Sequence, residues 1–252
     1  MSEITEYAPG TPSWVDIGTP DIAGSVTFYS ALFGWECVDQ GEEAGHYTMC
    51  LLRGQPVAAI GPAMNPGPPC WTTYFTVDDV DATAKLIADA GGTVVVAPMD
   101  VMDVGRMAVA MDSTGASFSL WQPLAHIGAG IVNEPGSLCW NELNTREPDA
   151  SITFYERVFG YTTNRSEQYN EFVLGERSVG GCMTMPDAIP AEVPNHWLVY
   201  FAVDDCDAAV ARARELGGTP MEPMDIPDVG RFAIVHDPLG TVFAVIKLDN
   251  PT

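Results

Sequence analysis

WNELNTREPDASITFYERVFG, residues 140–160, predicts a short strand, a turn and then a helix. Pro148 stands where the first turn of a helix belongs, and apolar side chains recur after it at helical spacing. A near-copy, WVDIGTPDIAGSVTFYSALFG, occupies residues 14–34, so that the Phe-Tyr and Phe-Gly pairs return 126 positions later. The chain is therefore an internal duplication, and each copy predicts a domain.

A second segment repeats with the same offset. WTTYFTVDDVDA, residues 71–82, matches WLVYFAVDDCDA, residues 197–208. Both predict a strand, an aspartate cap and a helix that a Gly-Gly pair closes. With the hairpins that follow, the sequence predicts an α+β fold of four β-α-β-β-β units, in which two mixed sheets curve into cups. We expect a first domain over residues 1–125, a linker over 126–137 and a second domain over 138–252.

Composition limits the partners of the protein. The 252 residues carry a formal charge of −23 with only 11 Lys plus Arg, which argues against nucleic acid and anionic membranes as partners. No apolar run approaches membrane-spanning length and the start lacks a signal-peptide pattern, so a cytoplasmic protein is expected. Six cysteines without a CxxC pattern predict reduced, buried thiols. Four units complete two cups, which favours a monomer or a loose homodimer.

Strand alternation predicts which side chains line the cups. If Trp14 points into the first cup, the side chains in the same register are Asp16, Tyr74, Ser119 and Trp121. In the second cup the side chains predicted to face inward include Trp140, Glu142, Asn144 and Tyr200. A cup lined in this way is a site for a small molecule, with the two tryptophans as walls that stack a planar or aromatic ligand.

Asp16 and Glu142 each lie two residues after a tryptophan. A carboxyl group that is partly removed from water tends to a raised pKa, so either residue is a candidate general acid or base near neutral pH. The structural alternative is that both carboxylates accept hydrogen bonds from backbone amides where strands pair across the cup.

Further candidates are cationic. Arg106 and Arg231 follow equivalent Val-Gly turns, and two repeat-matched arginines in a chain so poor in cations are candidates for binding an anionic or carbonyl group at the cup mouth. The alternative is an ion pair with nearby Asp103 or Asp228. His46 is expected at the rim of the first cup, whereas His126 is expected to be solvent-exposed in the linker.

The FY…FG opening, the VDDVDA…GG segment and the DxxG final hairpin resemble the vicinal oxygen chelate superfamily of glyoxalases, extradiol dioxygenases and bleomycin-resistance proteins. Over nearly the whole chain the sequence is most similar to a two-domain actinobacterial subfamily. That subfamily includes a mycobacterial antigen and Streptomyces proteins labelled hydroxylase or glyoxalase-like. The resemblance implies tandem glyoxalase-like domains.

The resemblance also implies where metal ligands would lie. The corresponding positions hold Trp14, Thr72 and Ser119 in the first cup, and Trp140, Leu198 and Ala244 in the second. None is His or Glu, so no metal and no other cofactor is expected.

These observations favour a metal-independent acid/base enzyme of the isomerase, lyase or cyclase type, acting on a hydrophobic oxygenated metabolite such as one of secondary metabolism. One alternative is a metal-free protein that sequesters a drug or metabolite, as bleomycin-resistance proteins do. The other is a glyoxalase-like metalloenzyme with displaced ligands such as His46, Asp16 or Glu142.

Overall fold

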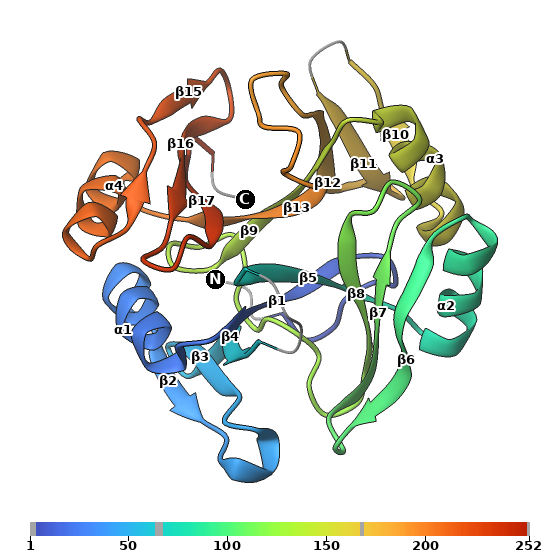
Figure 1. Ribbon diagram of the computed structural model, residues 1–252, viewed down its shortest axis with the longest axis horizontal. Helices are drawn as coiled ribbons and strands as arrows, with labels where there is room; N and C mark the ends of the chain where they lie inside the picture. The colour runs from blue at the N-terminus through green and yellow to red at the C-terminus, as the bar shows by residue number, and fades with distance from the viewer. Residues whose placement is uncertain (1–3, 64–67, 167–168, 251–252) are drawn as a thin grey trace.

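The computed structural model describes residues 4–63, 68–166 and 169–250, and it contains four β-α-β-β-β units in tandem (Figure 1). In the fourth unit, two short strands that pair with the same neighbour take the place of the first strand after the helix. The elements of the first half are β1 (Pro12–Thr19), α1 (Ile22–Phe33), β2 (Glu36–Asp39), β3 (Thr48–Leu52), β4 (Gln55–Pro62), β5 (Cys70–Thr76), α2 (Val80–Asp89), β6 (Thr93–Val101), β7 (Gly105–Met111) and β8 (Ser117–Pro123). The elements of the second half are β9 (Leu138–Thr145), α3 (Pro148–Phe159), β10 (Thr162–Asn164), β11 (Asn170–Leu174), β12 (Arg177–Thr184), β13 (His196–Ala202), α4 (Cys206–Glu215), β14 (Thr219–Pro220), β15 (Met224–Ile226), β16 (Gly230–His236) and β17 (Val242–Leu248).

Three of the four described α-helices begin at an aspartate cap, and two of the four end at a glycine. Asp21, Asp79 and Asp205 precede α1, α2 and α4, and each side chain accepts a hydrogen bond from a backbone amide of the first helical turn. Gly34 and Gly160 end α1 and α3 in the left-handed conformation that glycine adopts without strain.

The strands form one mixed sheet in each half. The first has the order β2-β3-β4-β1-β5-β8-β7-β6, and the second has β10-β11-β12-β9-β13-β17-β16-β14, with β15 paired to β16. The opening strands β1 and β5 pair antiparallel at the centre of the first sheet, as β9 and β13 do in the second. The predicted fold class, α+β with one mixed sheet in each half of a tandem duplication, is confirmed.

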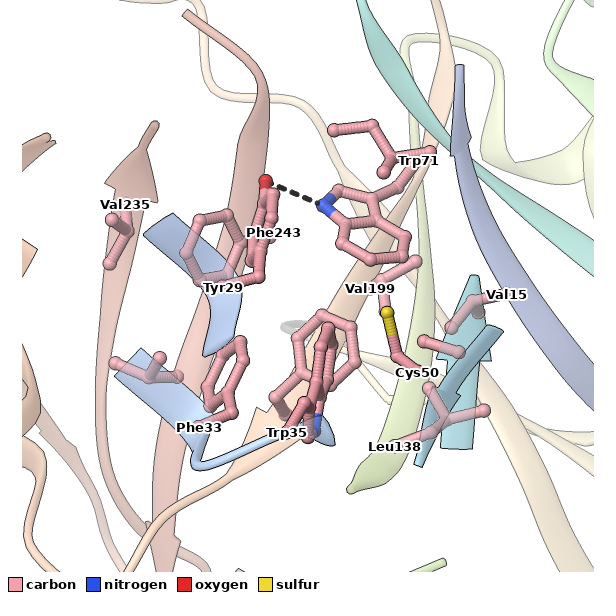
Figure 2. Packing of buried hydrophobic residues seen from close by; sticks show 14 of the residues in the cluster. Val15, Tyr29, Phe33, Trp35, Cys50, Trp71, Leu138, Val199, Val235 and Phe243 are labelled. Carbon is pink, nitrogen blue, oxygen red and sulfur yellow. Dashed lines mark hydrogen bonds between the residues drawn. The ribbon is translucent and has the colours of Figure 1, made fainter. Parts of the chain in front are cut away.

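The helix-bearing faces of the two sheets pack against each other. In Figure 1, α1 lies beside α4 and α2 lies beside α3, so each helix pair joins the two halves. Figure 2 shows Tyr29, Phe33 and Trp71 of the first half in one cluster with Val199 and Phe243 of the second. The cups are formed by the opposite faces of the sheets, so each cup faces away from the shared core.

Hydrogen bonds between aromatic side chains cross the same core. The Trp71 indole Nε1 donates to the Tyr29 hydroxyl at 3.1 Å, and this hydroxyl donates to Asp237 Oδ2 of the other half at 3.0 Å. The repeat-matched Trp197 donates to the Tyr155 hydroxyl at 2.9 Å in a second buried cluster, which also combines residues of both halves. These buried polar atoms are therefore satisfied, and they fix the orientation of the large rings in the shared core.

Among the described helices, none is both long enough and apolar enough to cross a membrane.

Candidate functional site

The concave face of the first sheet brings one carboxylate together with two phenols. The hydroxyls of Tyr47 and Tyr74 both donate to Asp16 Oδ2, at 3.0 and 2.9 Å. The indole Nε1 of Trp14 donates to the Tyr47 hydroxyl at 3.0 Å and so orients that phenol. Asp16 lies at the centre of the sheet, opposite Ala59 of β4 and Thr72 of β5.

The second cup repeats this arrangement. Glu142 Oε1 accepts hydrogen bonds from the Tyr200 hydroxyl at 3.1 Å and from the Asn144 amide at 3.3 Å. The Trp140 indole donates to the Tyr169 hydroxyl at 2.8 Å, and Tyr169 in turn is hydrogen-bonded to Glu142. Both carboxylates are therefore held mainly by phenols rather than by the backbone amides of the structural alternative.

Burial is the largest influence on the protonation of both carboxyl groups. It raises the pKa of Asp16 to about 6, and the hydrogen bonds from Tyr74 and Tyr47 oppose the shift. Burial also raises the pKa of Glu142, against the hydrogen bonds from its neighbours. Burial and the nearby carboxylates raise the pKa values of the tyrosines well above the ordinary range, so these phenols remain hydrogen-bond donors.

A glycine makes room for the phenol in the second cup. Gly181 pairs with Glu142 across β12 and β9, and a Cβ added there would lie 1.7 Å from the Tyr169 hydroxyl oxygen. In the first cup, a Cβ on Gly61 would lie 2.9 Å from the Tyr47 ring. The position of each phenol over its carboxylate thus depends on a missing side chain on the neighbouring strand.

Tyr47 and Tyr169 are site residues that the sequence analysis missed. They precede β3 and β11, where the offset between the two halves has fallen from 126 to 122 because the connecting loop is shorter in the second half. Tracing the repeat through this deletion would have paired the two tyrosines. Their contact with the carboxylates depends on strand pairing, which the repeat alone does not show.

The linker, rather than solvent, covers one end of the first cup. The His126 ring meets the Trp14 ring edge-on at a centroid distance of 4.5 Å. The backbone carbonyl of His126 accepts a hydrogen bond from the Trp121 indole at 2.8 Å. Ala129 packs on the same tryptophan, which is only 3% exposed. The expectation of a solvent-exposed His126 is wrong, and Trp14 presents no open stacking wall because the linker covers it.

The two cups share the tryptophan and the two tyrosines around the carboxylate, but they differ at three other matched positions next to it. The first-cup residues Gly18, Gly61 and Thr72 are equivalent in strand register to the second-cup residues Asn144, Met183 and Leu198. The first cup is therefore lined by small side chains, and Asp16 and Tyr74 stay partly exposed. In the second cup Leu198 is 5% exposed, Tyr200 is 5% and Glu142 is 6%, so that the carboxylate is sealed.

The last strands complete the cups. Ser119 is buried beside Tyr74, its register partner on β5, and Ala244 takes the equivalent place beside Tyr200. Cys70, the partner of Gly18, is an exposed thiol at the open end of the first cup. The prediction that all the cysteines are buried is therefore wrong for Cys70.

Arg106 and Arg231 do not face either cup. Arg106 pairs with Asp81 on α2 and with Asp100 on β6, at 3.0 and 2.8 Å. Arg231 pairs in the same way with two aspartates of the second half. Because α2 covers the opposite face of the sheet, the predicted role of these arginines as ligand clamps is not supported, and the ion pairs form with partners other than Asp103 and Asp228.

His46 belongs to an exposed turn. Its backbone is left-handed with φ of 60°, and its Nδ1 lies 2.9 Å from Asp39 Oδ2. The side chain next in sequence, Tyr47, is the one that enters the cup.

Comparison with known proteins decides the family. Residues 11–120 match the family model described as the glyoxalase/bleomycin resistance protein/dioxygenase superfamily, and residues 140–246 match a glyoxalase-like domain model. CFP32 of Mycobacterium tuberculosis, provisionally named a glyoxylase, is 47% identical over 260 residues that cover 98% of each chain. The chain belongs to this superfamily.

Other superfamily members extend the comparison. The anthracycline biosynthesis protein DnrV of Streptomyces peucetius is 40% identical over 266 residues, which cover 97% of this chain and 96% of DnrV. The Mn(II)-bound glyoxalase of Novosphingobium aromaticivorans has a TM-score of 0.67 at 16% identity, covering 100% of this chain and 87% of that one. The 2,3-dioxygenase LapB of a Pseudomonas strain has a TM-score of 0.66 at 13% identity, covering 98% and 93%. The two structural likenesses show the fold alone.

The residues of this chain do not fit the metal that some superfamily members bind. The Trp14 side chain donates to a phenol, and Leu198 and Ala244 carry no donor atom. Within the described parts of the chain, no group of three or more His, Cys, Asp or Glu side chains is placed to hold an ion. Of the displaced ligands considered, His46 faces Asp39, while both cup carboxylates are engaged by phenols.

We predict that the purified protein carries no stoichiometric Zn, Fe, Ni or Mn, because a hydroxyl and a phenol-bound carboxylate make a weak ligand set for these ions. Elemental analysis of protein expressed in metal-supplemented medium is the measurement. Titration with each ion, followed by thermal unfolding, is the control for a site emptied during purification. About one ion per chain retained through dialysis against a chelator would contradict the prediction.

Proposed function

We propose that the protein binds a small, hydrophobic, oxygenated metabolite in the first cup and that Asp16 transfers a proton to or from it. The observation that carries the proposal is the Asp16–Tyr47–Tyr74 cluster. It holds a partly exposed carboxyl group with a pKa of about 6 between two phenols. Such a group is present in both protonation states near neutral pH, as acid/base catalysis requires.

The roles of the surrounding side chains follow from their contacts. Both phenols donate to Oδ2, so Oδ1 is the oxygen through which Asp16 would exchange a proton with the ligand. The tyrosine rings and Met49 supply apolar walls, and Thr72 supplies a polar group next to the carboxylate. Isomerisation, dehydration or hydration, and cyclisation need only this positioning and proton transfer.

The first cup is favoured over the second because the side chains next to its carboxyl group are smaller and more exposed. Thr72 and Gly18 are partly exposed beside Asp16, whereas Leu198 and Asn144 are buried beside Glu142. In this proposal Glu142 is a structural group that orders Tyr169 and Tyr200, and the second cup is a filled copy of the first. The name of the relative DnrV, an anthracycline biosynthesis protein, supports a biosynthetic metabolite as the ligand class.

A second function, sequestration of a ligand without chemistry, needs the same open cup and no proton transfer. Product analysis distinguishes the two functions. A ligand released unchanged after long incubation supports sequestration, whereas a rearranged or dehydrated product supports the enzyme.

The test of the site exchanges the residue that faces the carboxylate on the neighbouring strand, Thr72 in the first cup and Leu198 in the second. Thr72→Leu places in the first cup the side chain that fills the second, and it is expected to weaken ligand binding about tenfold or more by occupying the ligand's space. Leu198→Thr is the matched control and should leave binding unchanged. Binding is followed by native mass spectrometry with an anthracycline and a small-metabolite extract as probes. If Leu198→Thr weakens binding and Thr72→Leu does not, the second cup is the site.

A further inference from the structure

Two cysteines face each other across an edge hairpin of the first sheet. Cys37 of β2 and Cys50 of β3 are direct partners in the antiparallel register. Their sulfur atoms lie 3.2 Å apart, and the Ser30 hydroxyl of α1 lies 3.3 Å from Cys37 Sγ. Both cysteines are thiols in this structure.

The two thiols have different surroundings. Cys37 is partly exposed near the sheet edge, whereas Cys50 is fully buried in the shared core. The contact with Cys50 lowers the pKa of Cys37 to about 7, with help from Ser30 and against the effect of burial. The same contact and burial raise the pKa of Cys50. Cys37 is thus the thiol that ionises and meets solvent, and Cys50 is a protonated partner within reach.

We propose that Cys37 and Cys50 form a peroxide-sensitive dithiol site, in which Cys37 is the attacking residue and Cys50 the resolving residue. The Cys37 thiolate attacks one oxygen of a hydroperoxide, so that an S–O bond forms and the O–O bond breaks. With hydrogen peroxide the leaving hydroxide takes up a proton and departs as water. The Cys50 sulfur then attacks Cys37 Sγ, the S–S bond forms and the S–O bond breaks, which releases a second water. Two thiols are oxidised to one disulfide and one peroxide is reduced to two waters.

The backbone is already arranged for this bond. Facing residues on antiparallel strands have Cα atoms about 4.5–5.5 Å apart, within the range that disulfides span. Strand pairing on both sides of the two cysteines, from Glu36↔Leu51 to Asp39↔Thr48, holds this separation. The bond would therefore form by side-chain movement alone.

The site belongs to the first half only. The equivalent facing pair in the second half is Thr163 and Phe172, which cannot form a disulfide. The hairpin that carries the cysteines also leads into the cup, since Tyr47 immediately precedes β3. The proposed disulfide would cross-link the edge hairpin of the first sheet on the face opposite its cup, and it has no counterpart in the second sheet. The proposal stands independently of the function proposed for Asp16.

The experiment treats the full-length reduced protein with a small excess of hydrogen peroxide and follows intact mass. The expected product is lighter by about 2 Da, the two thiol hydrogens, whereas methionine oxidation adds mass. Trypsin leaves both cysteines in one peptide because no Lys or Arg precedes Arg53, so the oxidised protein is cleaved at Glu42 or Glu43 without reductant. A Cys37–Cys50 cross-linked peptide, restored to two peptides by dithiothreitol, is the expected result.

Variants and an internal comparison complete the test. Cys50→Ala should block the disulfide and leave a Cys37 sulfenic acid that dimedone traps, and Cys37→Ser should abolish both products. Cys70 is exposed as a residue, but partial removal of its thiol from water and the charge of Asp16 raise its pKa, so in the same digest it should react more slowly than Cys37. Faster labelling of Cys70, or loss of both free thiols without a Cys37–Cys50 peptide, would overturn the proposal. The wild-type digest alone decides this if a variant does not fold.

Discussion

Asp16→Asn is expected to lower turnover of the substrate by about a hundredfold or more, because the amide keeps the shape of the side chain but cannot take up or release the proton. Ligand affinity should stay within about a few-fold of wild type, since the amide oxygen still accepts from the phenols that hold Asp16 Oδ2. The measurement is single-turnover and steady-state kinetics on the ligand identified by native mass spectrometry.

The duplicated cup supplies the matched control. Glu142→Gln makes the same chemical change in the sealed cup, and we expect it to leave turnover near wild type. For the wild type, if Asp16 acts as a base, the rate should rise with pH through the Asp16 pKa of about 6; if it acts as an acid, the rate should fall over the same range. Unchanged turnover in Asp16→Asn would exclude the acid/base role, and loss only in Glu142→Gln would transfer it to the second cup.

The same substitution is expected to stabilise the fold at alkaline pH. The pKa of Asp16 is raised from 3.8 to about 6 by burial, so the folded state holds this proton more tightly than the unfolded chain. The contribution of the Asp16 carboxyl group to stability is therefore largest below its pKa in the unfolded chain, and it declines as the pH rises to its pKa in the folded protein. Asp16→Asn removes the buried charge and should raise the free energy of unfolding by about 1–3 kcal/mol at pH 8, with the gain vanishing near pH 4.

Urea unfolding of wild type and Asp16→Asn at pH 8 and at about pH 4.5 measures this difference. A surface control is Asp81→Asn, which should lower the free energy of unfolding at pH 8 instead of raising it. The reason is that Arg106 lowers the pKa of Asp81, so the charged form of this carboxylate is favoured in the folded state. If Asp16→Asn is less stable than wild type at pH 8, the two phenols outweigh burial and the carboxylate is a structural anchor. If both variants shift alike, the effect comes from net charge rather than from the site.

Local patterns in the sequence account for the architecture. The duplicated strand–helix openings, the aspartate caps and the closing glycines predicted four β-α-β-β-β units in two mixed sheets, because helix caps, apolar periodicity and turn chemistry act over a few residues. Strand alternation likewise placed Trp14, Asp16 and Tyr74 on one face. Their contacts with Tyr47 come instead from the pairing of β3 with β4 and of β4 with β1, which the repeat alone does not show.

Pairing between segments distant in the sequence determined the contacts of the candidate site residues and the exposure of the two carboxylates. Whether Arg106 meets a ligand or Asp81 depends on which sheet face α2 covers, and whether His126 meets solvent or Trp14 depends on the path of the linker. The difference between an open and a sealed cup arises in the same way. Gly18, Gly61 and Thr72 are far apart in the sequence, and they matter together only because three strands place them around one carboxylate. A side chain's burial and pKa depend on everything packed around it, so only the tertiary structure separates Asp16 from Glu142.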